Sequence, residues 1–277
     1  MRAGYLGPPG TFSEEAVKAD PRATGWELVP LPTVFDTVMA VQEGGVDRGL
    51  VPIENSVEGS VNATLDALAV EAEDVAIVAE VVHAVRQCLI ARRPLALEDI
   101  RRVVSHPQAN AQCARFLRTR LPTARVVAVN STADAVRMVA ESSDPVAALG
   151  NRLSAELYGC EILRAGVEDV PGNETRFVWL ARRGAAPAER GPWKTSIVFW
   201  GVGAEEPGWL VRCLSEFAFR GVNLTKIESR PRKQGLGRYF FFVDLEGRDA
   251  EGPVAEALQG LRRHAEHVRI LGSYPAA

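Results

Sequence analysis

The sequence lacks several features that would place it in a class of proteins at once. Its 277 residues include only 4 cysteines, and these stand far apart with no Cys-x-x-Cys pair. Such spacing predicts neither a zinc site nor a disulfide framework, so we expect reduced, buried thiols. No apolar run reaches the roughly 18 residues of a membrane span. The first residues also leave no room for the apolar part of a signal peptide, and we expect a cytoplasmic protein that does not enter a membrane.

The chain has no surplus of basic charge either. It has 32 lysines and arginines against 35 acidic residues, a formal net charge of −3, whereas nucleic-acid-binding domains usually have a basic surplus. His264 and His267 are three residues apart, but no third ligand accompanies them, so we expect no metal. Apolar residues make up 47% and charged residues 24%, as in soluble globular domains. The composition therefore predicts a globular protein with no nucleic-acid partner.

A linker is predicted at residues 181–192, which are rich in alanine, glycine, proline and charge and show no hydrophobic periodicity. It separates a first domain, residues 1–182, from a second domain, residues 193–277. The first domain alternates β-branched runs with helical patterns, which predicts an α/β fold with a parallel sheet covered by helices. The expected strands are a first one before residue 7, followed by 28–31, 49–53, 75–82, 103–105, 126–129, 146–149 and 174–180, and the expected helices are 14–19, 35–43, 61–68, 109–120 and 133–141.

Several strand-to-helix loops of the first domain carry helix-capping residues. Thr11 and Glu14 have the spacing of a capping box, as do Ser105 and Gln108, and residues 130–132 (NST) precede another helix. In open α/β sheets these loops gather at one edge and build the ligand crevice, where free helix N–H groups attract anions. Residues 7–10 match no nucleotide-binding loop. The loops predict a site for a polar or anionic small molecule, unless each capping residue is only a cap.

The second domain has a simple order of elements. Strands are expected at 196–200, 222–228, 239–245 and 268–271, and amphipathic helices at 208–220 and 252–264. The resulting βαββαβ order is the ferredoxin-like arrangement.

Longer blocks of sequence resemble a known family. Residues 7–13 (GPPGTFS), 51–61 (VPIENSVEGSV), 105–113 (SHPQANAQC) and 173–177 (NETRF) are similar to the signature blocks of prephenate dehydratases and occur in the same order. Residues 221–231 (GVNLTKIESRP) resemble the phenylalanine-binding segment of the ACT domain that follows the catalytic domain in this family. The resemblance implies a two-lobed catalytic domain like a periplasmic binding protein, followed by an ACT regulatory domain.

The resemblance also implies an activity. Prephenate would lose CO₂ and its ring hydroxyl to give phenylpyruvate, on the route to phenylalanine, with no cofactor or metal. Two alternatives remain open at this point. The same reaction on arogenate would give phenylalanine directly, and a protein on the same fold could be an amino-acid sensor that catalyses nothing.

Candidate site residues follow from the matching blocks. The resemblance implies Thr175 as the hydrogen-bond donor to the leaving hydroxyl, although a strand threonine without a catalytic role is the plain alternative. Arg176 is expected to bind a substrate carboxylate through its guanidinium fork. The expected catalytic residues are Thr175, Asn55, Gln112, Ser105 and Glu54, and the expected substrate-binding residues are Thr11, Phe12, Ser13, Ser56, Arg176 and Phe177.

Regulation by L-phenylalanine is implied by the ACT-like segment. In the family two ACT domains pair and bind the effector at their interface, so a homodimer or homotetramer is expected. One departure concerns Trp209, which stands where the family commonly has alanine. Its indole could alter the response to the effector or could point outward without consequence. The expected effector-binding residues are Gly208, Leu210, Asn223, Leu224, Glu228, Ser229 and Arg230.

Overall fold

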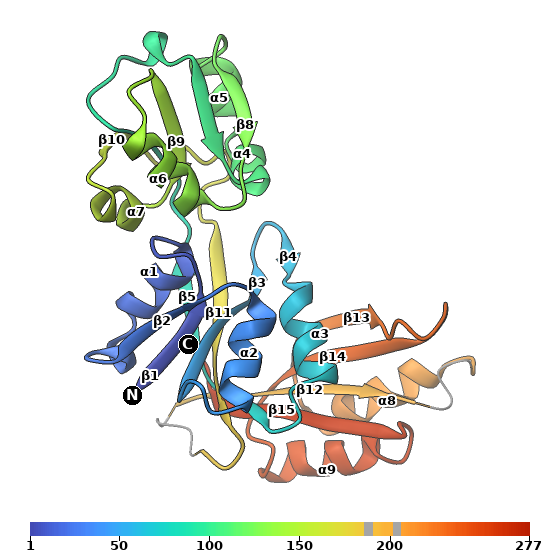
Figure 1. Cartoon of the computed structure of the whole chain (residues 1–277). Coiled ribbons are helices and arrows are strands. Elements are labelled where there is room, and N and C mark those ends of the chain that lie inside the picture. Colours follow the sequence, from blue (N-terminus) through green and yellow to red (C-terminus); the bar gives the residue numbers. More distant parts are fainter. Residues whose placement is uncertain (186–190, 202–205) are drawn as a thin grey trace.

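The computed structural model describes residues 1–185, 191–201 and 206–277. Within these ranges the strands form three sheets, each carrying helices, so the fold is α/β. Figure 1 shows the first sheet at the centre, the second above it and the third beside its lower part. Part of the predicted linker, residues 186–190, lies outside the described residues. None of the helices in the described ranges has the length and apolar character that a bilayer span requires.

The first lobe is built on a sheet with the strand order β2-β1-β3-β11-β5, and β4 pairs with β3. Strands β1, β2 and β3 are parallel, while β11 enters from far along the chain and runs antiparallel to both β3 and β5. The elements are β1 (Arg2–Leu6), α1 (Phe12–Ala19), η1 (Pro21–Ala23), β2 (Glu27–Leu31), α2 (Val34–Gln42), β3 (Arg48–Asn55), β4 (Gly59–Ser60), α3 (Asn62–Val70), β5 (Val75–Ala84) and β11 (Glu174–Arg182).

The second lobe is inserted between β5 and β11, and its sheet has the order β10-β6-β9-β7-β8. All five residues of its central strand are buried, and the small side chains at Ala147 and Ala148 let helices pack closely on both faces. The elements are β6 (Cys88–Ala91), η2 (Leu97–Asp99), β7 (Arg102–Ser105), α4 (Pro107–Gln112), α5 (Ala114–Arg120), β8 (Arg125–Ala128), α6 (Thr132–Glu141), β9 (Val146–Gly150), α7 (Arg152–Leu157) and β10 (Glu161–Ala165).

The C-terminal unit has a four-stranded antiparallel sheet in the order β13-β14-β12-β15. This is the ferredoxin-like βαββαβ order that the sequence predicts. Its helices cover one face and share a core with the sheet around Phe199, Cys213 and Phe217. The elements are β12 (Trp193–Trp200), α8 (Trp209–Ala218), β13 (Leu224–Pro231), β14 (Tyr239–Glu246), α9 (Gly252–Leu261) and β15 (His267–Pro275).

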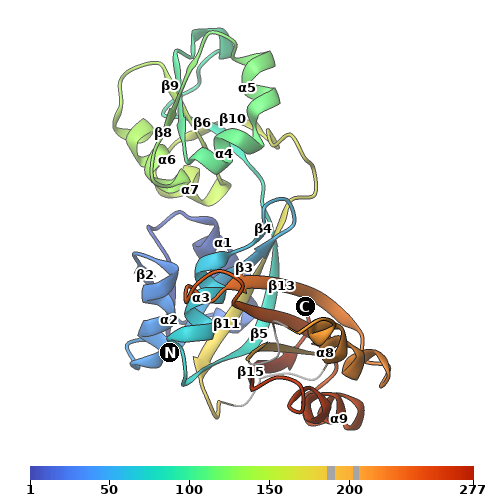
Figure 2. The same ribbon diagram turned by 90° about the vertical axis from the view of Figure 1, so that its right-hand side faces the viewer.

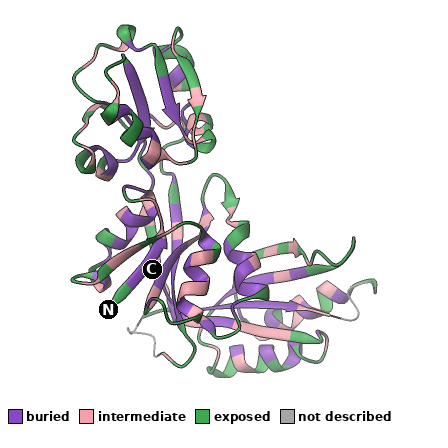
Figure 3. Ribbon diagram, in the orientation of Figure 1, coloured by how far each residue is buried: buried purple, intermediate pink, exposed green. Residues whose placement is uncertain are grey.

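The other face of the C-terminal sheet packs on the first lobe, as the view in Figure 2 makes clear. One hydrophobic core contains Val38 and Leu68 from the first lobe together with Phe242 and Tyr274 from the C-terminal sheet. The closest approach is at Gly272 of β15, where an added Cβ would overlap the carbonyl group of Ile77 in β5. Figure 3 shows buried residues continuing from one sheet into the other. The C-terminal unit is therefore joined to the first lobe by a core as well as by the chain.

The structure corrects three details of the sequence prediction. Both sheets of the lobes are mixed rather than parallel, since β11, β6 and β10 run antiparallel to their neighbours. The helix expected at 109–120 is two helices, α4 and α5, separated at Cys113. Ser105 is not a helix cap, because α4 begins after His106, whose ring accepts a hydrogen bond from the N–H of Gln108.

Candidate active site

A cavity of about 530 Å³ lies between the two lobes. The first lobe contributes the loop after β1 and the ends of β3 and β11, and the second lobe contributes α4 and the loop before α6. The lobes also touch beside the cavity, where the hydroxyl of Tyr158 donates to the carbonyl oxygen of Pro9 at 3.0 Å. Figure 1 shows this boundary between α1 and α7. The cavity has the size of a small-molecule site and is lined by both lobes.

Thr175 stands at the centre of a buried network of polar side chains. Its Oγ1 accepts a hydrogen bond from Asn55 Nδ2 at 2.9 Å, and the same nitrogen donates to Asn173 Oδ1 at 2.7 Å. Both Asn55 and Thr175 are 7% exposed and line the cavity. Their backbones are neighbours because Thr175 of β11 is paired with Asn55 of β3. The sheet register therefore brings together two residues that are 120 positions apart.

The amide of Asn55 is held in one orientation by its own loop. Its Oδ1 accepts from the backbone N–H groups of Val57 and Glu58, both at 3.0 Å. The Asn55 Nδ2 group must then face Thr175 as a donor, and its hydrogen bond uses one lone pair of the Thr175 hydroxyl oxygen. In the described part of the chain, the Thr175 hydroxyl accepts this hydrogen bond but donates none. The arrangement leaves the hydroxyl proton of Thr175 available to a ligand in the cavity.

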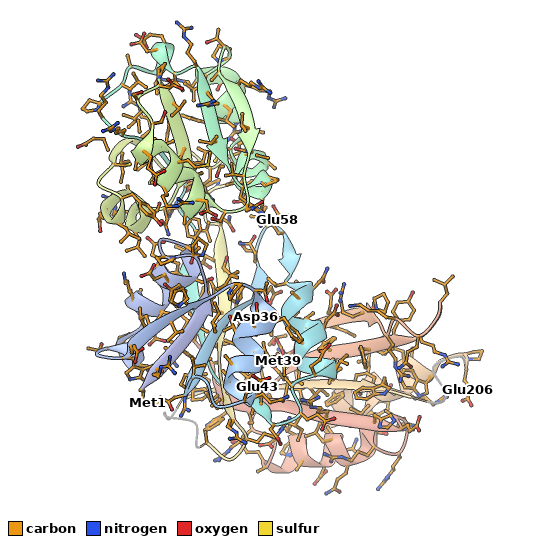
Figure 4. The ribbon with its side chains drawn as sticks, viewed as in Figure 1. Met1, Asp36, Met39, Glu43, Glu58 and Glu206 are labelled. Atoms are coloured by element: carbon orange, nitrogen blue, oxygen red, sulfur yellow. The ribbon has the colours of Figure 1, made fainter. Side chains whose placement is uncertain are left out.

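A chain of side-chain amides extends this network into the second lobe. Gln112 Oε1 accepts from Asn173 Nδ2 at 3.4 Å and from Gln87 Nε2 at 3.5 Å, while Gln112 Nε2 donates to Glu58 Oε1 at 3.4 Å. Figure 4 shows Glu58 at the turn between β3 and β4, facing the second lobe. Gln87 Oε1 is buried and has no hydrogen-bond partner in the described part of the chain. That oxygen is an acceptor available to a ligand donor.

Two helices direct their N-termini at the cavity. Thr11 caps α1 by accepting from the N–H of Glu14 at 3.3 Å, and Ser131 caps α6 by accepting from the N–H of Asp134 at 2.9 Å. Thr11 and Ser131 both line the cavity. The residues described as lining it include no lysine or arginine. Any anion bound here would be held by hydroxyls, amides and helix N–H groups.

The capping box predicted at Thr11 is confirmed in one half only. Glu14 does not reach back to the N–H of Thr11 but accepts from the N–H of Gly10 at 2.5 Å. Gly10 has a φ of +90° and lies against Ser154 of the second lobe. A side chain at this position would be strained and would crowd the boundary between the lobes.

Seven of the predicted catalytic and substrate-binding residues line this one cavity. Apart from the polar network, two aromatic rings supply apolar walls, one from the first residue of α1 and one from β11. The seven residues are Asn55, Gln112, Thr175, Thr11, Phe12, Ser13 and Phe177.

Arg176 does not lie in the cavity, contrary to the expectation that it binds a substrate carboxylate. Its side chain is 11% exposed and is held between Asp244 at 2.6 Å, Glu54 at 3.1 Å and Glu80 at 3.2 Å. Burial opposes the charge, but these carboxylates, Asp244 foremost, raise the pKa of Arg176 above its ordinary value. The physical reason is strand alternation, because Arg176 faces the side of β11 opposite to its neighbours Thr175 and Phe177.

Three further predicted residues also lie outside the cavity lining. Ser105 is fully buried, and its hydroxyl donates to the carbonyl oxygen of Leu149 at 2.8 Å, so it holds β7 to the neighbouring strand β9. Glu54 faces the C-terminal sheet, with Lys226 at 3.5 Å. Ser56 lies behind the network, where its Oγ accepts from the N–H of Glu174 at 3.0 Å. All three stabilise the walls of the cavity rather than line it.

The expected effector residues are spread along one edge of the C-terminal sheet. Glu228 accepts from the Ser60 hydroxyl at 3.1 Å, and Arg230 forms a fork with Asp66 of α3 at 3.0 Å. Ser229 lies on the opposite side of β13 and is exposed. The remaining four stand at the start of α8 and around the start of β13, namely Gly208, Leu210, Asn223 and Leu224.

Trp209 does not point outward. It is 3% exposed, packs against Phe199 and Phe241, and donates from Nε1 to the carbonyl oxygen of His264 at 2.7 Å. The indole therefore belongs to the core of the C-terminal unit and connects α8 to the turn after α9.

Sequence reasoning missed two polar residues of this cavity network. Asn173 stands within the matched block before β11 but was not singled out, and its amide contacts Asn55 and Gln112. Gln87 is 2% exposed although it adjoins the apolar run of β6. A lone glutamine at the entrance of an apolar strand was the available signal. Among the residues that the structure describes, no group of three or more metal-ligating side chains is present.

Comparison with known proteins identifies relatives along the whole chain. A family model described as prephenate dehydratase matches residues 3–185. A prephenate dehydratase of Amycolatopsis methanolica is 42% identical over 277 residues, covering 100% of this chain and 89% of that protein. The arogenate dehydratase/prephenate dehydratase 2 of Arabidopsis thaliana is 42% identical over 288 residues, covering 99% of this chain and 73% of that protein.

Two solved structures are similar over nearly the full length. A prephenate dehydratase of Arthrobacter aurescens in complex with L-Phe has a TM-score of 0.91 and 39% identity, covering 99% of this chain and 90% of that chain. GqqA, a quorum quenching acylase, has a TM-score of 0.87 and 35% identity, covering 100% of this chain and 98% of that chain.

Proposed function

The chain belongs to the prephenate dehydratase family, and from this premise we propose that it converts prephenate to phenylpyruvate in phenylalanine biosynthesis. In this reaction the bond between the ring and its carboxylate breaks and CO₂ leaves. The released electron pair makes the ring aromatic as the carbon–oxygen bond breaks on the far side. The departing hydroxide takes up a proton and leaves as water. The enzyme must therefore bind a dianion and assist the departure of hydroxide.

The hydrogen bond from Asn55 to Thr175 carries this proposal. Because Asn55 Nδ2 is a donor 2.9 Å from Thr175 Oγ1, the threonine hydroxyl acts as a donor toward the cavity. The bond also polarises the hydroxyl, which strengthens the hydrogen bond that it gives in turn. We propose that Thr175 donates to the leaving hydroxyl group of prephenate. A preorganised donor of this kind stabilises charge as it develops.

The two carboxylates of prephenate are assigned to the helix N-termini. The N-termini of α1 and α6 lie on opposite lobes and both line the cavity through their caps, Thr11 and Ser131. Each offers backbone N–H groups and the positive end of a helix dipole. Ser13 lies beside the first of them, and Phe12 and Phe177 would contact the ring. Gln112 and Gln87 would orient the substrate through their amides.

Incubation of the purified protein with prephenate alone tests the activity, with phenylpyruvate as the product to be measured. A Thr175→Ala variant should lose about 10²–10³ in kcat, the usual effect of removing one preorganised donor. Thr175→Ser keeps the hydroxyl and should retain most of the activity. Thr123→Ala, at an exposed position in the second lobe, is the control and should match the unmodified protein. Normal turnover by the Thr175→Ala variant would contradict the assigned role.

Arogenate is the second candidate substrate, because a relative of 42% identity is named for both activities. Arogenate has an amino group where prephenate has a keto group, so the same ring chemistry would yield phenylalanine. Assaying both substrates side by side decides between them. Binding of either compound without any turnover would instead indicate a sensor that has kept the fold.

We also propose the finer division of the chain that the resemblance implies. Residues 1–182 would form a catalytic domain of the two-lobed, periplasmic-binding-protein-like kind, and residues 193–277 an ACT regulatory domain. L-Phenylalanine would bind to the ACT domain and inhibit the enzyme. The Arthrobacter aurescens relative, whose structure contains L-Phe, supports this assignment. Calorimetric titration of the intact protein with L-phenylalanine is the test, and an absence of binding heat would rule it out.

A homodimer or homotetramer through the ACT domains is proposed on the same grounds. β13 is an edge strand of its sheet and presents backbone groups to which a second copy could add. The four free cysteines support a reducing compartment, in keeping with the proposed cytoplasmic location. Sedimentation of the purified protein with and without L-phenylalanine would give the oligomeric state.

A further inference from the structure

A second cavity, of about 690 Å³, lies where the C-terminal sheet meets α3 of the first lobe. It shares no residue with the cavity between the lobes or with the proposed effector segment. Its described charged lining residues are four arginines, Arg183, Arg232, Arg262 and Arg269, and one glutamate, Glu73. A concave surface with this excess of positive charge favours an anion.

Two of these arginines have a structural role. Arg183 donates from Nε to the carbonyl oxygen of Glu73 at 2.7 Å and from an Nη to that of Ile270 at 3.0 Å. Arg269 donates to the carbonyl oxygens of Ala69 and Ala72, at and just beyond the end of α3. Arg269 thereby satisfies a carbonyl group that the C-terminus of α3 leaves free, and Arg183 ties the segment after α3 to β15. Burial and the nearby Arg183 lower the pKa of Arg269 from its ordinary value.

The other two arginines have no such role. Arg232 forms no ion pair with the described residues, its Nε is buried without a hydrogen-bond partner, and its guanidinium lies 5.8 Å from the Trp200 ring centre and 5.6 Å from that of Phe240. Arg262 likewise has no ion pair in the described part of the chain. A buried guanidinium nitrogen normally has an acceptor, so the unpartnered Nε gives Arg232 unused binding capacity.

An aromatic corner completes the cavity. Trp200 and Phe240 meet edge to face, with ring centres 4.9 Å apart and planes at 89°, and His267 stacks on Trp200 at 4.8 Å. A planar ring lodged in such a corner gains aromatic contacts, and its acidic groups would face the arginines. We propose that this cavity is a second ligand site, for a small anion that combines a planar ring with at least two negative charges.

The proposal does not depend on the dehydratase activity, and the test measures binding alone. Intact protein at low ionic strength is titrated calorimetrically with three probes: adenosine 5′-monophosphate, phthalate and inorganic phosphate. The first two join a ring to a phosphate or to two carboxylates, and the third has no ring. At least one ring-bearing probe should bind tenfold or more tightly than inorganic phosphate. Which one does so identifies the acidic group that the cavity accepts.

Variants locate the binding. Arg232→Gln and Arg262→Gln should each weaken binding of the ring-bearing probe at least tenfold. Arg118→Gln, which removes an exposed arginine of the second lobe, should leave binding unchanged. Three results would overturn the proposal: no binding of either ring-bearing probe at millimolar concentration, equal binding by inorganic phosphate, or undiminished binding by both cavity variants.

Discussion

At the scale of single residues, the direction of one hydrogen bond decides the proposed chemistry. Threonine is a weak acid, and its hydroxyl can either donate or accept. The loop N–H groups of Val57 and Glu58 fix the amide of Asn55, and that amide fixes Thr175 as a donor. The proposed catalytic role would therefore belong to the pair of residues and not to the threonine alone.

Asn55→Asp tests this direction with almost no change of shape. The new carboxylate keeps the acceptor for Val57 and Glu58 but replaces the donor that faces Thr175. The Thr175 proton would then point at the carboxylate, and kcat should fall about 10²-fold. Asn62→Asp, at an exposed position at the start of α3, is the matched control and should retain full activity. Steady-state kinetics with prephenate, together with a circular dichroism spectrum, give the answer.

The residues that sequence reasoning misplaced are those whose partners are distant. Arg176 is next to Thr175 in the chain, but its carboxylate partners Glu80 and Asp244 lie 96 and 68 positions away. Ser105 was assigned as a cap because the Ser-x-x-Gln spacing fits, yet β7 runs through it and its hydroxyl bonds to a neighbouring strand. Local spacing predicts local contacts, and neither of these contacts is local.

At the scale of helices and strands, the periodicity of the sequence predicted where strands occur better than it predicted which strands pair. The expected strands 28–31, 49–53, 75–82, 103–105 and 146–149 all lie within observed strands. Missing were β6 and β10, which carry no alternating pattern of their own. The antiparallel insertion of β11 between β3 and β5 was also missed. β11 begins 90 residues after the end of β5 and 119 residues after the end of β3, and the sequence pattern of a single segment does not indicate so distant a partner.

Asp20 joins two such distant elements. It caps η1 and its Oδ2 accepts from Nε1 of Trp179 in β11 at 2.6 Å. Burial opposes the charge, but hydrogen bonds from Arg22 and Trp179 outweigh it and hold the pKa of Asp20 below its ordinary value. A carboxylate with a lowered folded-state pKa stabilises the fold above the unfolded pKa of about 3.9, and the gain disappears as the pH falls below it.

Asp20→Asn should therefore lower the free energy of unfolding by about 1.5–3 kcal/mol at pH 7, the range for hydrogen bonds to a charged group. The difference from the unmodified protein should shrink as the pH falls through the aspartate range. Urea unfolding at pH 7 and below pH 4 measures both values. Asp99→Asn, at an exposed position, should change stability at neither pH. A pH-independent difference would mean that the charge of Asp20 is not what stabilises the contact.

At the scale of the whole molecule, a mostly buried cluster of charges joins the first lobe to the C-terminal unit. Arg176 bonds to Asp244 of β14, and Lys194 of β12 lies 2.6 Å from Glu80 of β5. Lys226 of β13 faces Glu54 of β3. The three positive and three negative groups balance, and the cluster begins one residue after Thr175. The cluster therefore brings the C-terminal sheet into contact with β11 at the residue next to Thr175.

Asp244→Asn should weaken this joint. Removing one member of a buried ion pair leaves an uncompensated charge and costs about 3 kcal/mol, which corresponds to a fall in Tm of roughly 5–10 °C. Because the first lobe and the C-terminal sheet share a core, both should unfold in the same calorimetric transition. Glu246→Gln, at an exposed position on the same strand, should leave Tm unchanged. An unaltered Tm in Asp244→Asn would show that the cluster does not hold the units together.

The bare backbone at Gly272 has a consequence for protein engineering. Since β15 lies against the main chain of β5 with no space for a methyl group, any other residue there would push the two units apart. A C-terminal unit transplanted from a relative would pack on the first lobe only if it carried glycine at the position that matches Gly272. In chimaeras without that glycine, β15 should not pack against β5, even where each half folds well by itself.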